Sequence, residues 1–513
     1  MKRIVRAVKE QGLMDKSQAQ IDQLKPDPHN LIQKDGMRLY PRSFYRRGEA
    51  LYCIAMLDNA KQLYRISNGP VHDGLEGAEA KVEGLHVLEA GLTKKNAEAL
   101  HSLFPFTTPK SLREERTTIG CGDRLGLATA AHLRAVRKFK AFPVLAQQSI
   151  RELNFTGRNF EGVVTDASFL VFQEGYEGGW GADGDHLKTI DDIDVALQAK
   201  MPMITLDLTA VLHPETADYS EDKLETEFGK LPQEVREYIV KYYSKRIFNI
   251  GEGTISLSES EARKCALMYW DALEFAAKVD THLRSKRGDQ YDLEISIDET
   301  TSPTLPAHHL FITMELQRRG VTVNSLAPRF IGDFQKAVDY IGVVDVFERQ
   351  FRVHCDIAKA HGDYKISIHS GSDKFSVYPV IGKHTRGKLH LKTAGTSWLE
   401  ALRTISQADP ELYRLIHRKA AEYYPEALKS YHITADISVL PKLEDTPDTD
   451  LGKFLEIGES RQMLHITYGG LLNDPEVRDR FFAALAEHEE LHYELLEKHF
   501  TKHLERLGLE RVQ

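Results

Sequence analysis

The chain has 513 residues and a formal net charge of −9, and 42% of its residues are hydrophobic and 28% charged. This is an ordinary globular composition, long enough for one large domain with additions or for several domains. The charges are spread along the chain, so no basic footprint for nucleic acid is visible. We find no membrane-length apolar run, no signal-peptide core and no CxxC pair among the four cysteines. Composition therefore favours a cytoplasmic enzyme for a small molecule, with a homo-oligomer left open.

Residues 1–115 differ in pattern from the rest of the chain. Around GMRLYPRSFY and GEALYCIAMLD the apolar residues follow a mixed β pattern that does not alternate regularly with helices. We expect a separate N-terminal α+β domain or cap there.

Short extended segments alternate with amphipathic helical ones over residues 116–400. Strands that alternate with helices pair in parallel, and eight of them close a (β/α)8 barrel of the TIM type, whose active site gathers at the carboxyl ends of the strands. An open doubly wound sheet is the alternative, but its usual GxGxxG phosphate signal is missing. The expected strands are TTIGC (117–121), PVLAQQ (143–148), GWGADGDH (179–186), MITLDL (203–208), LEISID (293–298), NSLAPRF (324–330), KISIHS (365–370) and LHLKTA (389–394).

Two further regions are predicted to be mostly helical. Residues 210–290 lie between the fourth and fifth expected strands and are too long for a plain connection, so a helical insertion is expected. Residues 401–513 are expected to form a C-terminal extension that ends in a charged helix from about Asp474 to Leu507.

Ionisable side chains follow the inward-facing positions of three late strands. Strict alternation sends Glu294 and Asp298 inward in LEISID, His369 in KISIHS, and His390 and Lys392 in LHLKTA. Burying such groups costs several kcal/mol (about 2–7 for a neutral polar group) unless they are paired, hydrogen-bonded or metal-bound. Because this cost of burial recurs on three strands, we predict an active site at this end of the barrel.

The stretch WGADGDHLKT raises the question of whether Asp185 and His186 belong to a turn or to a site. His186 and His369, together with one or two carboxylates, would suit a divalent cation such as Zn, Mn, Co, Ni or Fe. Asp185 would then lie beside a metal ligand, close enough to move protons on a substrate oxygen. We interpret His186 as a ligand and Asp185 as an acid/base.

A competing zinc motif lies near the C-terminus. HEELH at 488–492 matches HExxH, in which two histidines one helical turn apart bind zinc. However, His499 and His503 repeat the same spacing in the same charged helix, as expected of a polar helical face, and no further ligand motif accompanies it. The metalloprotease interpretation is therefore disfavoured.

Several long blocks in one order resemble the bacterial tagaturonate epimerase family. The resemblance runs from roughly residue 115 to the end, and the first 110 residues match weakly. The blocks are TTIGCGDRLGLATAAHLRAV, PVLAQQSIREL, FQEGYEGGWGADGDHLKT, LAPRFIGDFQKAVDYIG, KISIHSGSDKFSVYP and LHLKTAGTSWLEAL.

The resemblance implies a metal-dependent enzyme that interconverts D-tagaturonate and D-fructuronate in hexuronate catabolism. By that likeness Asp185 is the proton acceptor, Glu294 the donor, and His186 and His369 are metal ligands. The remaining ligand is left open, and the candidates are His309 in PAHHLF and Asp333 in RFIGDF.

The epimerised carbon lies β to the ketone, so removal of an α proton cannot invert it, whereas retro-aldol cleavage and re-addition would. The alternative is a metal-dependent aldolase or isomerase that acts on a related keto sugar. Metal-dependent aldolases have a similar Asp-His pair and a His-Gly-Gly-Ser-Gly segment that resembles His369-Ser370-Gly371-Ser372. Arg329 and Lys374 are candidates to clamp the substrate carboxylate.

Overall fold

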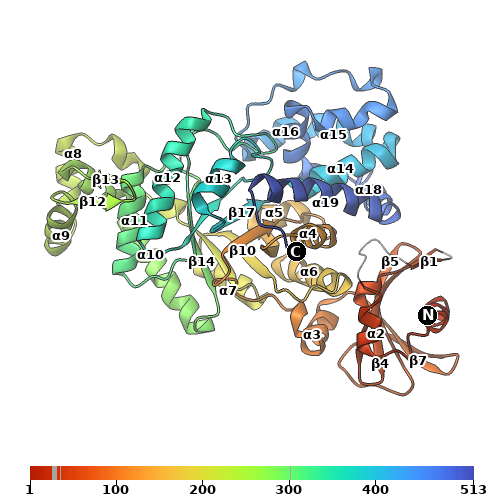
Figure 1. The fold of residues 1–513 in the computed structure, drawn as a ribbon. Helices are drawn as coiled ribbons and strands as arrows, with labels where there is room; N and C mark the ends of the chain where they lie inside the picture. Colours follow the sequence, from red (N-terminus) through yellow and green to blue (C-terminus); the bar gives the residue numbers. More distant parts are fainter. Residues whose placement is uncertain (26–31, 35, 301, 513) are drawn as a thin grey trace.

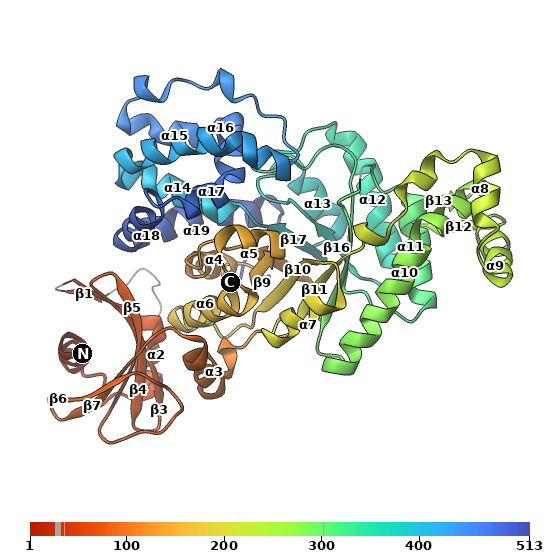
Figure 2. The same cartoon turned by 180° about the vertical axis from the view of Figure 1, so that it is seen from behind.

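The computed structural model describes residues 1–25, 32–34, 36–300 and 302–512. A central barrel joins an N-terminal sheet domain, a group of C-terminal helices and a projecting arm (Figure 1). The N-terminal domain and the arm lie at opposite ends of the molecule, as the reverse view also shows (Figure 2).

The predicted (β/α)8 barrel is confirmed. Eight parallel strands form a closed sheet, because the last strand pairs with the first, and this closure excludes the open doubly wound alternative. Each strand overlaps one of the segments expected from the sequence. In chain order they are β8 (Thr117–Cys121), β9 (Phe142–Ser149), β10 (Gly181–Leu187), β11 (Met203–Asp207), β14 (Asp292–Ile297), β15 (Ser325–Pro328), β16 (Lys365–Ile368) and β17 (Leu389–Thr393).

Helices follow the strands and cover the barrel. Many begin at a side-chain cap, as in α5, where Ser149 accepts the Glu152 backbone N–H. The longest helix, α10, starts with a capping box of Ser258 and Glu261 and ends at Arg287, just before Gly288. The covering helices are α4 (Thr129–Val136), α5 (Ile150–Thr156), α6 (Phe160–Gln173), α7 (Ile190–Gln198), α10 (Glu259–Arg287), α11 (Pro306–Arg318), α12 (Val344–Ala360), α13 (Tyr378–Thr385) and α14 (Thr396–Ala408).

The N-terminal region is an antiparallel sheet with its own apolar core, in the order β1-β2-β4-β5-β7-β6 with β3 paired to β4. Helix α3 (Lys94–Leu103) connects it to the barrel and packs against α6. The remaining elements are α1 (Lys2–Glu10), α2 (Gln18–Asp22), β1 (Ile32–Lys34), β2 (Met37–Leu39), β3 (Tyr45–Arg47), β4 (Ala50–Leu57), β5 (Ala60–Ser67), β6 (Ala78–Val82) and β7 (Leu85–Ala90).

The segment between β11 and α10 forms the projecting arm. It contains α8 (Glu221–Phe228), α9 (Gln233–Tyr243) and a small hairpin of β12 (Ile247–Ile250) and β13 (Gly253–Ser256). Helices α8 and α9 pack against α10, so the arm is anchored to the barrel by that long helix.

The C-terminal helices have a second apolar core beside the barrel. They are α15 (Pro410–Ala427), α16 (Gly458–Ile466), α17 (Tyr468–Asn473), α18 (Arg478–Glu487) and α19 (Glu489–Arg506). Helix α19 packs against α4 and α14, which brings the end of the chain back to the barrel wall. Within the described residues, no helix combines the length and apolarity needed to cross a bilayer.

Candidate active site

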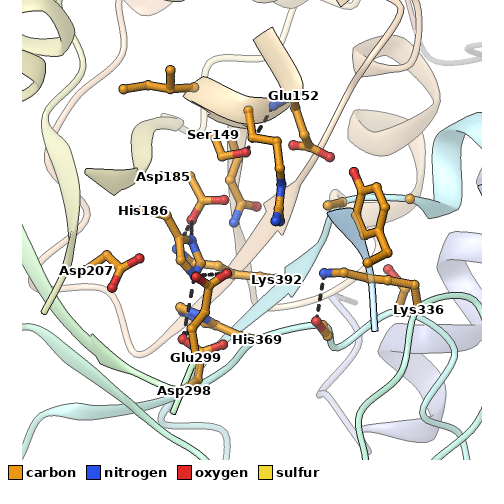
Figure 3. Close-up of a pocket in the computed structure, with 18 of the residues that line it drawn as sticks. Ser149, Glu152, Asp185, His186, Asp207, Asp298, Glu299, Lys336, His369 and Lys392 are labelled. Carbon is orange, nitrogen blue, oxygen red and sulfur yellow. Dashed lines mark hydrogen bonds and ion pairs between the residues drawn. The ribbon is translucent and has the colours of Figure 1, made fainter. Parts of the chain in front are cut away.

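The end of β10 departs from regular strand geometry. Neighbouring residues of a strand point to opposite faces, so a regular strand would separate Asp185 from His186. Here the pairing of β10 with β11 shifts register between Gly184 and Leu187, and His186 has a φ of 55°. Bulges of this kind re-aim side chains near active sites. As a result both Asp185 and His186 face the mouth of the barrel (Figure 3).

Two histidines and an aspartate converge at this mouth. His186 Nε2 lies 3.5 Å, and His369 Nδ1 3.0 Å, from the Oδ1 atom of Asp298, and the two rings are 4.9 Å apart. Each ring is held from behind by a carboxylate, since His186 Nδ1 contacts Asp185 at 2.8 Å and His369 Nε2 contacts Glu294 at 2.6 Å. Metal-binding histidines are typically oriented in this way, with the second nitrogen on a carboxylate.

The three inner atoms fit a divalent cation. His186, Asp298 and His369 each offer one ligand atom, and these atoms lie within 4.8 Å of one another. The buried Nδ1 atom of His369 faces Asp298 at 3.0 Å, but the contact lacks hydrogen-bond geometry. Three protein ligands beside an open position are typical of a catalytic zinc-type site.

The charge around the group also favours a cation. Asp183, Asp185 and Glu294 surround the Lys392 ammonium at 2.6–2.9 Å, and Asp298 adds a fourth carboxylate nearby. Burial disfavours the charged form of Lys392, but the three carboxylates outweigh burial and raise its pKa well above the usual value. One ammonium cannot balance four carboxylates, so the remaining negative charge favours either a bound cation or protonation of the two histidines.

The same carboxylates change the pKa of both histidines. Burial opposes protonation, but Asp185 and Asp298 raise the pKa of His186 well above its ordinary value, and Asp298 raises that of His369. Asp185 itself stays ionised, because Lys392 and His186 overcome burial and hold its pKa well below the usual range.

A cavity of about 350 Å³ opens in front of the three inner atoms. Asp185, His186, Asp298 and His369 line one side of it, and Lys392 reaches its floor. Glu294 is fully buried behind His369 and is not among the lining residues. Its position is that of a residue that orients His369, whereas Asp185 lies where it can touch a bound molecule.

The structure does not bring either candidate for the remaining ligand to this group. His309 is buried on α11, where its two ring nitrogens contact His354 at 2.8 Å and Tyr364 at 2.6 Å. Asp333 lies on the loop after β15 and forms a backbone bridge with Ile341. The third inner atom belongs instead to Asp298, which alternation placed on the inward face but which the sequence pattern did not single out as a ligand.

The two candidate carboxylate clamps are also displaced from the cavity. The Arg329 guanidinium donates to the Thr300 carbonyl and lines a smaller adjoining cavity of about 220 Å³, which shares His369 and Lys336 with the first. The Lys374 ammonium is buried and donates to three backbone carbonyls, at 2.6–2.9 Å. Burial lowers the pKa of Lys374 to about 7. Neither residue lines the cavity beside His186.

A second Asp–His–His group lies behind the loop that follows β16. Asp373 accepts from His499 Nε2 at 2.7 Å and from Arg461 at 2.6 Å. His503 donates from Nδ1 to the His499 carbonyl and accepts the Asp373 backbone N–H at Nε2. Burial lowers the pKa of His503 to about 4, so this ring is neutral. The group thus fixes α19 to the loop, with its ligand atoms already engaged.

The HEELH segment serves the packing of the C-terminal region. The helix expected from Asp474 to Leu507 is divided at His488, which lies between α18 and α19. Glu489 is buried, pairs with Lys61 and accepts from the Tyr40 hydroxyl at 2.5 Å, so it joins the N-terminal domain to α19. Neither histidine of the motif enters a metal-ligand group within the described residues.

A closed (β/α)8 barrel with an ordered polar cavity at the carboxyl ends of its strands defines a barrel enzyme. A family model described as tagaturonate epimerase matches residues 40–507. The chain belongs to the tagaturonate epimerase family, as the sequence resemblance predicted, and it is an isomerase of the epimerase type.

Individual relatives agree along nearly their whole length. The tagaturonate/fructuronate epimerase of Thermotoga maritima is 38% identical over 473 residues, which cover 92% of this chain and 97% of that protein. A native crystal structure of the fructuronate-tagaturonate epimerase from Cohnella laeviribosi superposes with a TM-score of 0.89 at 39% identity, covering 96% of this chain and 99% of that one. A complex of the same epimerase with one glycerol gives a TM-score of 0.88 at 40% identity, covering 92% and 96%.

Proposed function

We propose that the protein interconverts D-tagaturonate and D-fructuronate with the help of a divalent cation. The observation that carries the proposal is the group of three converging atoms from His186, His369 and Asp298 beside an open cavity, in a chain of the tagaturonate epimerase family. These residues would hold the ion. When bound, the ion would act as a Lewis acid toward a substrate oxygen.

Asp185 is the residue placed to move a proton on the substrate. It lines the cavity, and its Oδ1 atom takes the bonds to both His186 and Lys392. Among the described residues, none donates to Oδ2, which leaves this oxygen for a substrate hydroxyl. Lys392 and His186 overcome burial and hold the pKa of Asp185 low, so the carboxylate is ionised at neutral pH, which is the form in which a general base acts.

The substrate's chemistry then defines the proton path. Asp185 takes the proton of the β-hydroxyl, the bond between the α and β carbons breaks, and its electron pair moves to the ketone to give an enediolate and an aldehyde. Rotation of the aldehyde exposes its opposite face, the carbon–carbon bond re-forms, and Asp185 returns the proton to the new hydroxyl. Lys392 keeps the carboxylate in position through its 2.6 Å contact.

Incubation of the metal-loaded protein with D-tagaturonate in D₂O, followed by NMR, tests this function. We expect D-fructuronate with no deuterium at the inverted carbon, because that carbon keeps its hydrogen when a carbon–carbon bond breaks. Accumulation of three-carbon fragments would instead identify an aldolase. Deuterium at the inverted carbon at the rate of turnover would refute the retro-aldol route, and no turnover would refute the proposed function.

A further inference from the structure

The cavity has an acidic side and a basic side. The acidic side carries the carboxylates around His186 and His369, and Lys336 lies on the opposite side (Figure 3). Arg124 and Arg151 also line the cavity, and both are close enough to Lys336 to affect its pKa. A keto-sugar acid has a matching polarity, with its ketone and hydroxyls toward one end and its carboxylate at the other.

The three cations differ in how they are already used. Arg124 is buried and pairs with Glu152 at 2.9 Å, so its charge is balanced within the protein. Arg151 is exposed, and its guanidinium lies 5.0 Å from the ring of Tyr431. The Lys336 ammonium donates to the Ser370 hydroxyl at 2.8 Å and forms no ion pair with any carboxylate of the described residues.

The environment of Lys336 disfavours an unbalanced charge. Burial and the neighbouring Arg151 and Arg124 lower its pKa, and Glu152 and Glu299 offset this only in part. A partly buried ammonium whose charge no carboxylate balances is costly, and a bound carboxylate would remove that cost. Because Lys336 also lines the cavity, the partner can come from solution.

The position of Lys336 is fixed and close to the inner atoms. Its hydrogen-bond partner Ser370 directly follows His369 in the chain and has a φ of 47°. The Lys336 carbonyl accepts from Gln462, and the preceding Gln335 accepts from the Thr434 backbone and hydroxyl. The C-terminal extension therefore holds the loop that presents this ammonium to the cavity.

We propose that Lys336, assisted by Arg151, binds the carboxylate of the substrate and so orients its ketone toward His186 and His369. This inference rests on the proposed function, and it gives the carboxylate a site other than Arg329 or Lys374. The ligand class is a polyhydroxy acid, and the carboxylate is recognised by a charge-assisted hydrogen bond rather than by a bidentate fork.

Kinetics on two matched substrates test the proposal. D-tagaturonate carries the carboxylate, and D-tagatose carries a hydroxymethyl group in its place. For Lys336→Met we expect kcat/KM on tagaturonate to fall by about 10- to 100-fold, the worth of a hydrogen bond to a charged group, with less than about a threefold change on tagatose. Lys336→Arg should restore part of the loss. Lys383→Met, which removes an exposed cation that pairs with Glu348 and lines neither cavity, is the control and should leave the ratio between substrates near wild type.

An equal loss on both substrates, or an unchanged ratio for Lys336→Met, would overturn the proposal. Binding of D-gluconate by calorimetry gives a readout that does not need turnover. We expect Lys336→Met to weaken this binding by about tenfold or more at low salt, and less at high salt. If wild type turned over neither sugar, the proposed function would fail, while the gluconate measurement would still decide the role of Lys336. Unchanged gluconate binding would contradict it.

Discussion

Two groups in this molecule contain one aspartate and two histidines, and they differ in what the ring nitrogens do. At the barrel mouth, His186 and His369 turn one nitrogen to a supporting carboxylate and the other toward Asp298 and the cavity. Behind the β16 loop, the nitrogens of His503 both contact backbone groups, and Arg461 shares the Asp373 carboxylate. The inner nitrogens of the first group are therefore able to bind a cation, whereas the corresponding atoms of the second group already bond to the protein.

The comparison shows that residue type and proximity do not define a metal site on their own. Both groups bring their candidate ligand atoms within 4.8 Å of one another. Both groups also line a cavity, but their partners differ. At the barrel mouth the inner ring nitrogens face Asp298, whereas in the second group His503 contacts backbone groups and Arg461 pairs with Asp373. Orientation by partners behind the ligands is the distinguishing feature.

The largest expected effect separates the two groups directly. His369→Ala should lose the bound ion and lose activity by more than the roughly 10- to 100-fold typical of removing only a supporting carboxylate. His503→Ala should keep the ion and reduce the melting temperature instead. Metal content by mass spectrometry and turnover are measured on the same preparations. His488→Asn, at the HEELH segment, is the matched control and should change neither quantity. Retention of the ion in His369→Ala together with its loss in His503→Ala would reverse the assignment.

A smaller effect is expected to distinguish the roles of Asp185 and Glu294, the two carboxylates that contact His186 and His369. If Asp185 is the acid/base proposed above, Asp185→Asn should lower kcat by about 10² to 10⁴ even at saturating metal. Glu294→Gln should weaken metal affinity by roughly 10- to 100-fold and regain most of its kcat when metal is added in excess, because Glu294 acts through His369. Titrating each variant with the metal while following turnover checks this. Full recovery of Asp185→Asn by excess metal would remove its catalytic role.

The smallest effect concerns pH and the second group. Burial opposes the charge on His499, but Glu400 and Asp373 raise its pKa above the usual value, while Arg461 opposes them. A raised folded pKa means that the stabilisation is fully present below about pH 6.5, the ordinary value, and is lost as pH rises through the folded pKa. We expect His499→Gln to lower the melting temperature by roughly 2–4 °C at about pH 6 and by less at about pH 9. A difference that stays constant or grows with pH would contradict the charged pairing.

The barrel could be predicted from the sequence because its strands are short, apolar and separated by regular helices. The alternation rule also placed Glu294, His369 and Lys392 on the inner face, and the structure shows His369 and Lys392 both in contact with Glu294 there. Both the strands and their inward-facing residues follow from the local spacing of apolar and polar residues, which can be read from a single sequence.

The identity of the third inner residue could not be derived in the same way. Asp298 shares its inward parity with Glu294, so alternation alone does not separate a ligand from a supporting carboxylate. His309 has a side chain of a type that binds metals, but it lies on α11, where it contacts the Tyr364 hydroxyl instead of the barrel mouth. Lys336 lies on an irregular loop whose position depends on the C-terminal extension, through Gln462. No local pattern reports such a long-range contact.

The divalent site at the barrel mouth is tested most directly by anomalous diffraction from crystals of the metal-loaded protein, recorded at the absorption edge of the metal. The account predicts one peak, about 2.0–2.2 Å from His186 Nε2, His369 Nδ1 and an Asp298 oxygen, and no peak among Asp373, His499 and His503. A peak at the second group, or none beside His186, would contradict it.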